Sequence, residues 1–398
     1  MSKHIGLLMM LKNEEKRLHV TLNSLIDDEK HSKVDSIIVY DTGSTDRTLE
    51  ILSEFCQSYG ITKHIKKGTF VDFATSRNQA LRFADGFREV DFLLLMDCND
   101  ELKGDLREYC ETIPDDKVAW LLHQCWWSGV MTRYYNLRLI RPRCGWKYRG
   151  VVHEYLTRDI KDEYISDRVP GVELYQDRTQ DDDKTSKRFK RDKKLLLREY
   201  RREGSNKDPR TVFYLAQTYS CLHEDDLALK HYTERSQMEG GFVEETFHAY
   251  YNAGKFMLAK GMIERGLFYL MESTKIMPRV EPLLEIVKYY RDKNMWLATQ
   301  FGIMACKLEY PGYAVLFVDE SQYRYERYHL LSIVAFYAGD EYLSTGYEAC
   351  QTAVSVSNSD VDNNNLKIYR LRLGLKDDDD KDDKDEQNTG VPVDATED

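Results

Sequence analysis

Residues 92–101 read Phe-Leu-Leu-Leu-Met-Asp-Cys-Asn-Asp-Glu, an apolar run that ends in a burst of acidic and polar side chains. The run is too short for a membrane span and long enough for a buried central strand. Ligands of open α/β sheets bind beyond the carboxyl ends of the strands, so these oxygen atoms should lie at a binding edge. Mg²⁺ and Mn²⁺ prefer such ligands, and phosphates accompany them. The stretch therefore indicates a metal-bridged diphosphate; the simpler alternative is an acidic turn.

Two earlier segments repeat this arrangement. Apolar runs at 5–11 and 36–40 end in Lys-Asn-Glu-Glu and Asp-Thr-Gly-Ser-Thr-Asp, respectively. Apolar residues at helical spacing follow each run, through 18–26 and 48–55, and another helical segment begins at 73–81. The alternation of strands and helices predicts a parallel sheet with right-handed crossovers. The polar ends of the strands should then meet at one edge.

Together these segments resemble the family 2 glycosyltransferases with the GT-A fold. The resembling motifs stand in that family's order and spacing, at 11–15, 41–48, 76–81 and 97–101. A further block at 138–154 is similar to the Val-His-Glu segment of a bacterial branch that glycosylates lipopolysaccharide cores and peptides. The resemblance covers about residues 1–178. It implies a GT-A domain with a mostly parallel, Rossmann-like sheet, a nucleotide-diphosphate sugar donor, usually uridine-linked, and a divalent metal.

Donor-binding roles follow from the resemblance, one position at a time. It implies that Glu14 and Asp41 hold the uracil and ribose, and that Asn13 belongs to the same donor-binding edge. Arg77 is expected near the diphosphate, where a guanidinium can bridge anionic oxygens. Asn78, next to it in the same motif, is placed with the donor as well.

The metal motif departs from the family pattern. The resemblance assigns metal or donor binding to Asp97, but Asn99 stands where the family has its second Asp, and Asp100 follows it. Asn99 offers a neutral carbonyl oxygen, and Asp100 supplies charge if the backbone turns favourably. Either metal affinity is reduced, or the motif is shifted by one residue. His153 is a further candidate, facing either the metal or the phosphates.

A sugar transfer to a hydroxyl group needs a carboxylate within hydrogen-bond reach of the acceptor proton. Glu154 is our first candidate for this catalytic base, and Asp177 is the competing one. The expected reaction is a single displacement with inversion, an outcome that only the resemblance implies. Departure of the diphosphate is the difficult step, and a metal and basic side chains stabilise its charge.

The stretch 181–191 is acidic at its start and basic afterwards, and includes Lys184 and Arg188. Its basic half could close over the diphosphate as a lid. The alternative is a solvated, charged linker helix, because runs of charge usually face water.

The second half of the chain predicts paired amphipathic helices. Aromatic residues recur at Tyr219, Phe256, Tyr290 and Phe336, at spacings of 37, 34 and 46, each followed by a small residue. The segment 213–232 is similar to one tetratricopeptide (TPR) repeat. The irregular period indicates three to four degenerate repeats, which must stack to bury their apolar faces. Their concave surface could bind a peptide, a protein partner or a second copy; alternatively this domain only packs on the first.

Composition sets outer limits. The expected domains are a transferase at 1–178, a linker helix at 179–207, repeats at 208–372 and a disordered acidic tail at 373–398. Residues 377–398 carry −9 of the net charge of −11, so no nucleic-acid footprint exists. The start of that tail, Asp-Asp-Asp-Asp-Lys, resembles an engineered protease site. Eight cysteines without metal-type pairs, with no visible signal peptide or apolar span, predict a cytoplasmic protein.

The sequence therefore predicts a metal-dependent hexosyltransferase acting on a UDP-sugar donor, with Mn²⁺ or Mg²⁺, and a glycan or polypeptide acceptor. The first alternative is a nucleotide-sugar-binding scaffold in which Asn99 marks a decayed metal site and the repeats bind a partner. The second is a nucleotidyltransferase, which is disfavoured because residues 10–14 offer no glycine-rich basic loop.

Overall fold

The computed structural model describes residues 2–114, 116–129, 131–158, 167–179, 184–314 and 316–375, without the side chains of Lys184 and Thr185. Most of the expected acidic tail, from 376 onward, lies outside the described residues. The chain divides into two compact units, Met1–Lys207 and Asp208–Asp398. No helix within the described ranges is both long and apolar enough to cross a bilayer.

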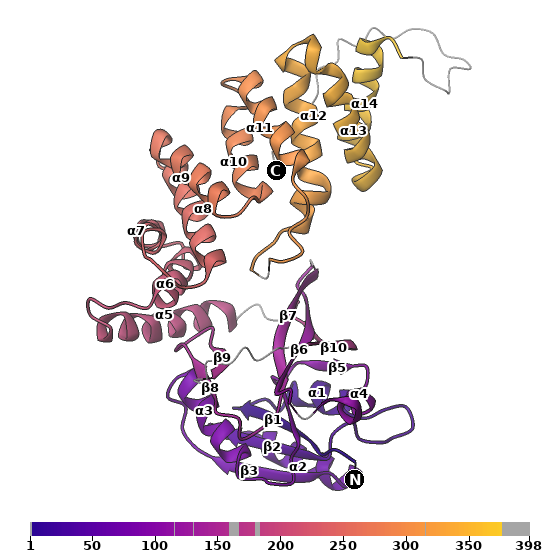
Figure 1. The fold of residues 1–398 in the computed structure, drawn as a ribbon, viewed down its shortest axis with the longest axis vertical. Coiled ribbons are helices and arrows are strands. Elements are labelled where there is room, and N and C mark those ends of the chain that lie inside the picture. The colour runs from indigo at the N-terminus through magenta and orange to yellow at the C-terminus, as the bar shows by residue number, and fades with distance from the viewer. Residues whose placement is uncertain are drawn as a thin grey trace. The chain divides into compact units, whose positions relative to one another are not determined.

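The first unit opens with alternating strands and helices (Figure 1). They are β1 (Ile5–Leu11), α1 (Leu18–Ser24), β2 (Ser36–Asp41), α2 (Thr48–Tyr59), β3 (Thr62–Lys67), α3 (Phe73–Ala84) and β4 (Phe92–Leu95). Strand β3 was not predicted from the sequence, because its residues Thr-Lys-His-Ile-Lys-Lys lack the continuous apolar run of a buried strand. As the edge strand of the sheet, β3 needs little burial.

The same sheet continues beyond β4 with strands of mixed direction. The remaining elements of the unit are β5 (Glu101–Lys103), α4 (Arg107–Thr112), β6 (Ala119–Trp127), β7 (Met131–Ile140), β8 (Trp146–Arg149), β9 (Tyr155–Arg158), β10 (Asp167–Asp177) and α5 (Lys184–Arg202). The eight-stranded sheet has the order β3-β2-β1-β4-β7-β6-β10-β5, while β8 and β9 form a separate pair. The four neighbouring strands β3, β2, β1 and β4 run parallel, and β7 runs antiparallel to both of its neighbours, β4 and β6.

Apolar residues cover both faces of the parallel half. Leu7 and Leu94 point into one core, together with α1 and α2, whereas Leu8 and Leu93 pack on the other side with α3. This alternation is what a strand buried on both faces requires, and it explains why these strands read as continuous apolar runs. The polar residues that follow β1, β2 and β4 therefore leave the sheet at one common edge.

The second unit is a series of helix pairs (Figure 1). The helices are α6 (Pro209–Cys221), α7 (Asp225–Ser236), α8 (Val243–Ala259), α9 (Ile263–Ile276), α10 (Val280–Tyr290), α11 (Met295–Lys307), α12 (Arg327–Ala338), α13 (Leu343–Ser357) and α14 (Asp360–Leu373). Small residues let paired helices approach closely: a Cβ on Gly254 of α8 would lie 3.0 Å from the carbonyl oxygen of Gly266 on α9. The α/β domain followed by TPR-like helices confirms the predicted fold class.

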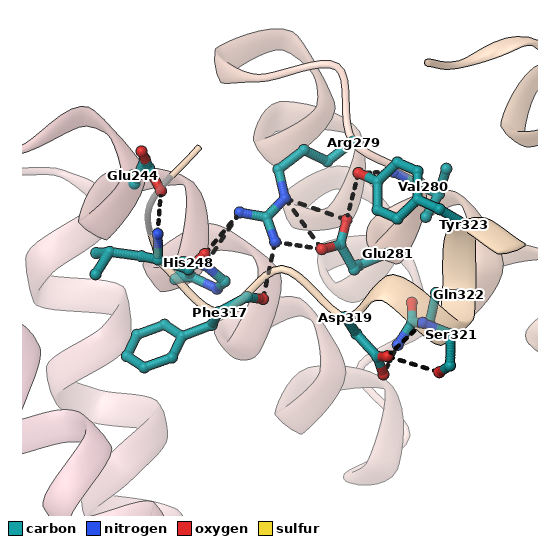
Figure 2. Close-up of polar contacts among 11 residues, drawn as sticks. Glu244, His248, Arg279, Val280, Glu281, Phe317, Asp319, Ser321, Gln322 and Tyr323 are labelled. Atoms are coloured by element: carbon teal, nitrogen blue, oxygen red, sulfur yellow. Dashed lines mark hydrogen bonds and ion pairs between the residues drawn. The ribbon is translucent and has the colours of Figure 1, made fainter. Parts of the chain in front are cut away.

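An inserted segment, 308–321, accounts for the longest repeat spacing. It lies between α11 and a short π-helix, Gln322–Glu326, and is fixed by α8 and the start of α10. Arg279 donates to the carbonyl oxygens of Leu316 at 3.0 Å and Phe317 at 2.9 Å. Figure 2 shows the contact with Phe317. Leu316 N donates to Oε2 of Glu244 at 2.6 Å. Buried polar groups thus hold the described residues of this insertion in place.

Candidate active site

A tight turn follows β4 and is closed by Asp100. Its Oδ2 accepts a hydrogen bond from Asp97 N at 2.9 Å, and its Oδ1 accepts one from Gln124 Nε2 of β6 at 3.2 Å. The side chain of Asp100 is buried. Burial raises the pKa of the Asp100 carboxyl to about 6, although Arg138 opposes the shift. Asp100 therefore shapes the turn from inside the protein.

Asp97 faces two guanidinium groups. Its Oδ1 lies 2.6 Å from Arg77 Nη2 of α3, and its Oδ2 lies 3.5 Å from Arg138 Nη2 of β7. Burial disfavours the charged carboxylate, but the two guanidinium groups outweigh it and hold the pKa of Asp97 well below its usual value. Asp97 is consequently an anion, and its side chain remains 35% exposed.

Arg77 connects Asp97 to the segment that carries Glu154. Its Nε donates to Oε1 of Glu154 at 2.5 Å. The neighbouring Asn78 fixes β8 from α3, donating to Tyr148 O at 2.9 Å and accepting from Tyr148 N at 2.7 Å. Asp72 caps the start of α3 through Thr75 N, which sets where the helix begins. Helix α3 thus positions Arg77 between two carboxylates.

The loops after β1 and β2 are bonded to each other. Asn13 has a left-handed backbone (φ 55°), and its Oδ1 accepts a hydrogen bond from Thr45 N at 2.8 Å. Asp41 is buried, and its Oδ1 accepts one from Ser44 N at 3.0 Å. Both side chains therefore organise these loops. Glu14 follows Asn13 in the loop after β1 and lines the cavity described next.

A cavity of about 500 Å³ occupies this edge of the sheet. Its lining combines acidic and amide groups from the strand ends, an aromatic ring, cations from α3 and α5, and Arg17 just before α1. The lining residues are Met10, Glu14, Arg17, Phe73, Arg77, Asp97, Cys98, Asn99, Lys187, Arg188 and Arg191. Oxygen ligands and basic groups thus face one polar space, which suits a nucleoside diphosphate and its counter-ion.

The chain's own oxygens fit a hard divalent cation in part. Asp97 and Asn99 line the cavity and offer a carboxylate and an amide oxygen. Oδ1 of Asn99 accepts a hydrogen bond from Gln176 Nε2 at 2.5 Å, which fixes the orientation of the amide. Mg²⁺ is commonly bound by one or two carboxylates with water and phosphates, so two protein ligands are adequate. Both oxygens of Asp100, the other predicted ligand of this turn, instead accept hydrogen bonds behind the turn.

The structure separates the residues expected at the site into groups. Glu14, Arg77, Asp97, Asn99 and Arg188 line the cavity, and Glu154 joins them through Arg77. Buried or supporting positions are taken by Asn13, Asp41, Asn78 and Asp100.

Two further candidates, His153 and Asp177, are absent from the described cavity lining, and a third, Lys184, has no described side chain. His153 is exposed and has a left-handed backbone (φ 50°). Asp177 is exposed and accepts hydrogen bonds from Thr179 N and Oγ1, which lower the pKa of its carboxyl. The side chain of Lys184 lies outside the described residues. None of the described lining residues comes from the segment of His153 or from β10.

Several site residues escaped the sequence analysis. Arg138 stands in the quoted block 138–154, but nothing in its sequence neighbourhood shows that it reaches Asp97. Lys187 and Arg191 lie one turn apart on α5, a signal visible in the basic half of 181–191. Arg17 precedes α1 and also faces the cavity. Only the folded arrangement selects these cations from the many others in the chain.

Known proteins and families are similar to different parts of this chain. Residues 7–178 match the family model for glycosyl transferase family 2. A search of curated proteins gave no match. TarS of S. aureus shares 13% identity, with 68% of this chain and 55% of that chain covered and a TM-score of 0.35.

Further structural matches are TPR proteins that are similar to the helical region. The C-terminal part of a TPR repeat-containing protein from Cytophaga hutchinsonii is 13% identical, covers 48% of this chain and 68% of that one, and has a TM-score of 0.36. YrrB, a TPR protein with an unusual peptide-binding site, is 15% identical, covers 44% and 82%, and has a TM-score of 0.34. Residues 7–178 are therefore similar to glycosyl transferase family 2 by their match to its family model.

Proposed function

We propose that this protein transfers a hexose from a uridine-diphosphate sugar to a hydroxyl group of a glycan or protein side chain, with inversion and with the help of Mn²⁺ or Mg²⁺. One observation carries the proposal: the cavity at the carboxyl edge of the sheet combines Glu14, Asp97 and Asn99 with the cations of α5. A nucleotide-sugar donor has the matching chemistry, with hydrogen-bonding groups at one end and a diphosphate in the middle.

The chain's own cations are suited to the diphosphate. Lys187, Arg188 and Arg191 recur along one side of α5 and line the same cavity as Arg77. Guanidinium groups can bond two phosphate oxygens at once, and they stabilise charge that grows as the diphosphate departs. The expected lid over the diphosphate gains support from this lining.

Asp97 and Asn99 would hold the divalent ion, which when bound neutralises charge on the leaving diphosphate. Arg77 and Arg138 keep Asp97 ionised at all pH values near neutrality, because they lower the pKa of its carboxyl. Gln176 keeps the carbonyl oxygen of Asn99 in a fixed direction. The carboxylate of Asp97 and the amide oxygen of Asn99 are therefore available as metal ligands throughout the pH range near neutrality.

Glu154 has more support as the catalytic base than Asp177. Its carboxylate is 14% exposed and is linked through Arg77 to the lining of the cavity. Asp177 instead caps its own turn through Thr179. In the proposed step, Glu154 accepts the proton of the acceptor hydroxyl while that oxygen attacks the anomeric carbon and the nucleoside diphosphate leaves.

A screen of nucleotide sugars for hydrolysis, with and without Mn²⁺, tests the proposal. We expect one UDP-sugar to release UDP in a metal-dependent manner, and the anomer of the sugar transferred to an added acceptor, read by NMR, to be inverted. If no nucleotide sugar releases its nucleotide, the proposed transfer activity is wrong. Binding of a nucleotide sugar without such release would favour the nucleotide-sugar-binding scaffold. The presence of Asn99 in the metal motif is the observation that keeps this second function open.

The two candidate bases can be separated in the same assay. Glu154→Gln keeps an acceptor for Arg77 but removes the basic carboxylate, so turnover should fall by about 10²-fold or more while donor affinity is retained. Asp177→Asn is the matched variant and should retain turnover. Near-normal turnover of Glu154→Gln would show that Glu154 is not the catalytic base.

A further inference from the structure

A second cluster of potential metal ligands lies on β6 and β10, apart from the cavity. His123 and Cys125 are two residues apart on β6, and Glu173 is paired in register with His123 on the neighbouring parallel strand. Because side chains alternate along a strand, these three point to the same face of the sheet. Their ligand atoms all lie within 4.8 Å of one another.

The three atoms form a compact triangle. Sγ of Cys125 lies 3.2 Å from Oε2 of Glu173 and 3.8 Å from Nδ1 of His123, and the third side, between His123 and Glu173, is 3.9 Å. Zinc binds nitrogen, oxygen and sulfur at about 2.0–2.3 Å, and tetrahedral angles then separate neighbouring ligands by roughly 3.3–3.8 Å. The observed triangle is close to one face of such a tetrahedron.

This cluster is separate from the candidate active site. Gln124 lies between His123 and Cys125 in the sequence and points to the opposite face, where it donates to Asp100. An ion on the cluster would therefore have the sheet between itself and the turn after β4. Its ligand chemistry also differs, since imidazole and thiolate select zinc-like ions over Mg²⁺ or Mn²⁺.

The surroundings orient two of the ligands. The His123 ring stacks on Tyr135 with centroids 5.0 Å apart, which holds the imidazole in place. Lys103 Nζ lies 3.7 Å from Oε1 of Glu173, leaving Oε2 directed toward the thiol. The buried side chain of Cys125 closes the inner side, whereas the side chains of His123 and Glu173 are about one-third exposed. Solvent or a ligand can therefore supply the fourth position.

Cations also surround the cluster and oppose a divalent ion. Lys103 faces Glu173, Arg133 is paired in register with Cys125, and Arg168 lies over Tyr135 at 4.2 Å. The thiolate of Cys125 and the carboxylate of Glu173 together neutralise the charge of one divalent ion. The neutral site is then not repelled by the neighbouring cations as a free ion would be. Without a metal, burial raises the pKa of the Cys125 thiol to about 11, with Glu173 adding to the shift.

We propose that His123, Cys125 and Glu173 form a binding site for a zinc-like transition-metal ion, with a fourth position open to solvent. The ion replaces the proton of the Cys125 thiol: the S–H bond breaks, a metal–sulfur bond forms, and the proton is released to solvent. Bound there, the ion would tie β6 to β10 on the face opposite the sugar-transfer site.

Titration of the full-length, metal-free protein with Co²⁺ tests this site, because a thiolate ligand gives a strong charge-transfer band in the near ultraviolet. We expect the band in the unaltered protein and in Cys144→Ser, a half-buried thiol elsewhere in the same domain, and its loss in Cys125→Ser. Glu173→Gln and His123→Gln should keep a weaker band, with affinity for Co²⁺ reduced by at least about tenfold.

Absence of the band from the unaltered protein would overturn the site. So would a band that survives in Cys125→Ser but disappears in Cys98→Ser, since that would place the ion at the turn after β4. Should Cys125→Ser fail to fold, the affinity of His123→Gln for Co²⁺ decides, because His123 is about one-third exposed. The outcome is independent of the proposed sugar transfer, which is measured with Mn²⁺ and does not use these ligands.

Discussion

Nη2 of Arg77 lies 2.6 Å from Oδ1 of Asp97, and Nε of the same guanidinium lies 2.5 Å from Oε1 of Glu154. One side chain from α3 thus joins the turn after β4 to the segment after β8. All three side chains are at least half-buried, so the pairing is only weakly screened by solvent. Arg77 therefore controls both the ionisation of Asp97 and the position of the proposed base.

Arg77→Lys should lower the rate of UDP-sugar hydrolysis by about 10²-fold or more. A lysine keeps the charge, but it cannot bond two carboxylates in fixed directions as the planar guanidinium does. The exposed Arg82, on the same helix, provides the control as Arg82→Lys. Activity of Arg77→Lys within twofold of the control would show that charge alone is sufficient.

Asn99→Asp should strengthen metal binding at the proposed site. The substitution adds a carboxylate to the lining beside Asp97, and charged oxygen ligands raise the affinity for a divalent ion. We expect the Mn²⁺ concentration for half-maximal hydrolysis to fall by roughly tenfold. The exposed Asn23→Asp should leave it unchanged. A value that rises or stays constant in Asn99→Asp would remove Asn99 from the ligand set.

Lys187→Ala combined with Arg188→Ala should weaken binding of UDP and flatten its dependence on ionic strength. Both residues line the cavity, so their loss removes favourable charge near the diphosphate. Calorimetric titration with UDP at two salt concentrations measures both effects. Lys194→Ala is exposed on the same helix and absent from the described lining, so it should bind normally. An equal loss of UDP affinity in the double variant and in Lys194→Ala would indicate that α5 is a solvated helix.

The apolar runs at 5–11, 36–40 and 92–96 predicted the strands that the structure shows at Ile5–Leu11, Ser36–Asp41 and Phe92–Leu95, because burial on both faces leaves a clear signal. The edge strand β3 gave no such signal, because its exposed lysines do not pack into a hydrophobic core. Residue type alone could not separate Asp97, which faces the cavity, from Asp100, which is buried behind it, because that choice depends on how the backbone turns. Arg138 reaches Asp97 only because β7 inserts between β4 and β6, a pairing of distant segments that local pattern does not encode.

Asp100 should make the stability of the protein depend on pH. Its folded pKa is raised to about 6, so between about pH 4 and 6 the folded state binds more protons than the unfolded state. The free energy of unfolding should therefore fall as pH rises through this window and level off above it. Urea unfolding of the protein and of Asp100→Asn at pH 4 to 7 isolates this contribution.

The difference in unfolding free energy between the two proteins is the quantity to follow, because the other titrating groups are common to both. The unaltered protein should lose stability relative to Asp100→Asn from about pH 4 to 6. The exposed Asp28→Asn serves as the control and should show no such trend. A difference that increases with pH would show that Asp100 is stabilised as an anion.

Arg279 and Glu281 form a buried ion pair in the helical unit (Figure 2). The side chain of Arg279 is fully buried, and besides Glu281 it bonds the carbonyl oxygens of the inserted segment 308–321. Arg279→Ala should lower the free energy of unfolding by about 3–5 kcal/mol, because Glu281 is left charged and without its partner.

The double variant Arg279→Met with Glu281→Gln should lower the free energy of unfolding by less than Arg279→Ala does, since it removes both charges. Arg265→Ala, an exposed position on α9, should change the unfolding free energy by less than about 0.5 kcal/mol. Limited proteolysis offers a second readout, as loss of Arg279 should open cleavage within 308–321 before the rest of the unit. If the double variant costs as much as Arg279→Ala, the hydrogen bonds to the insertion, and not the buried charge of Glu281, determine the stability at this point.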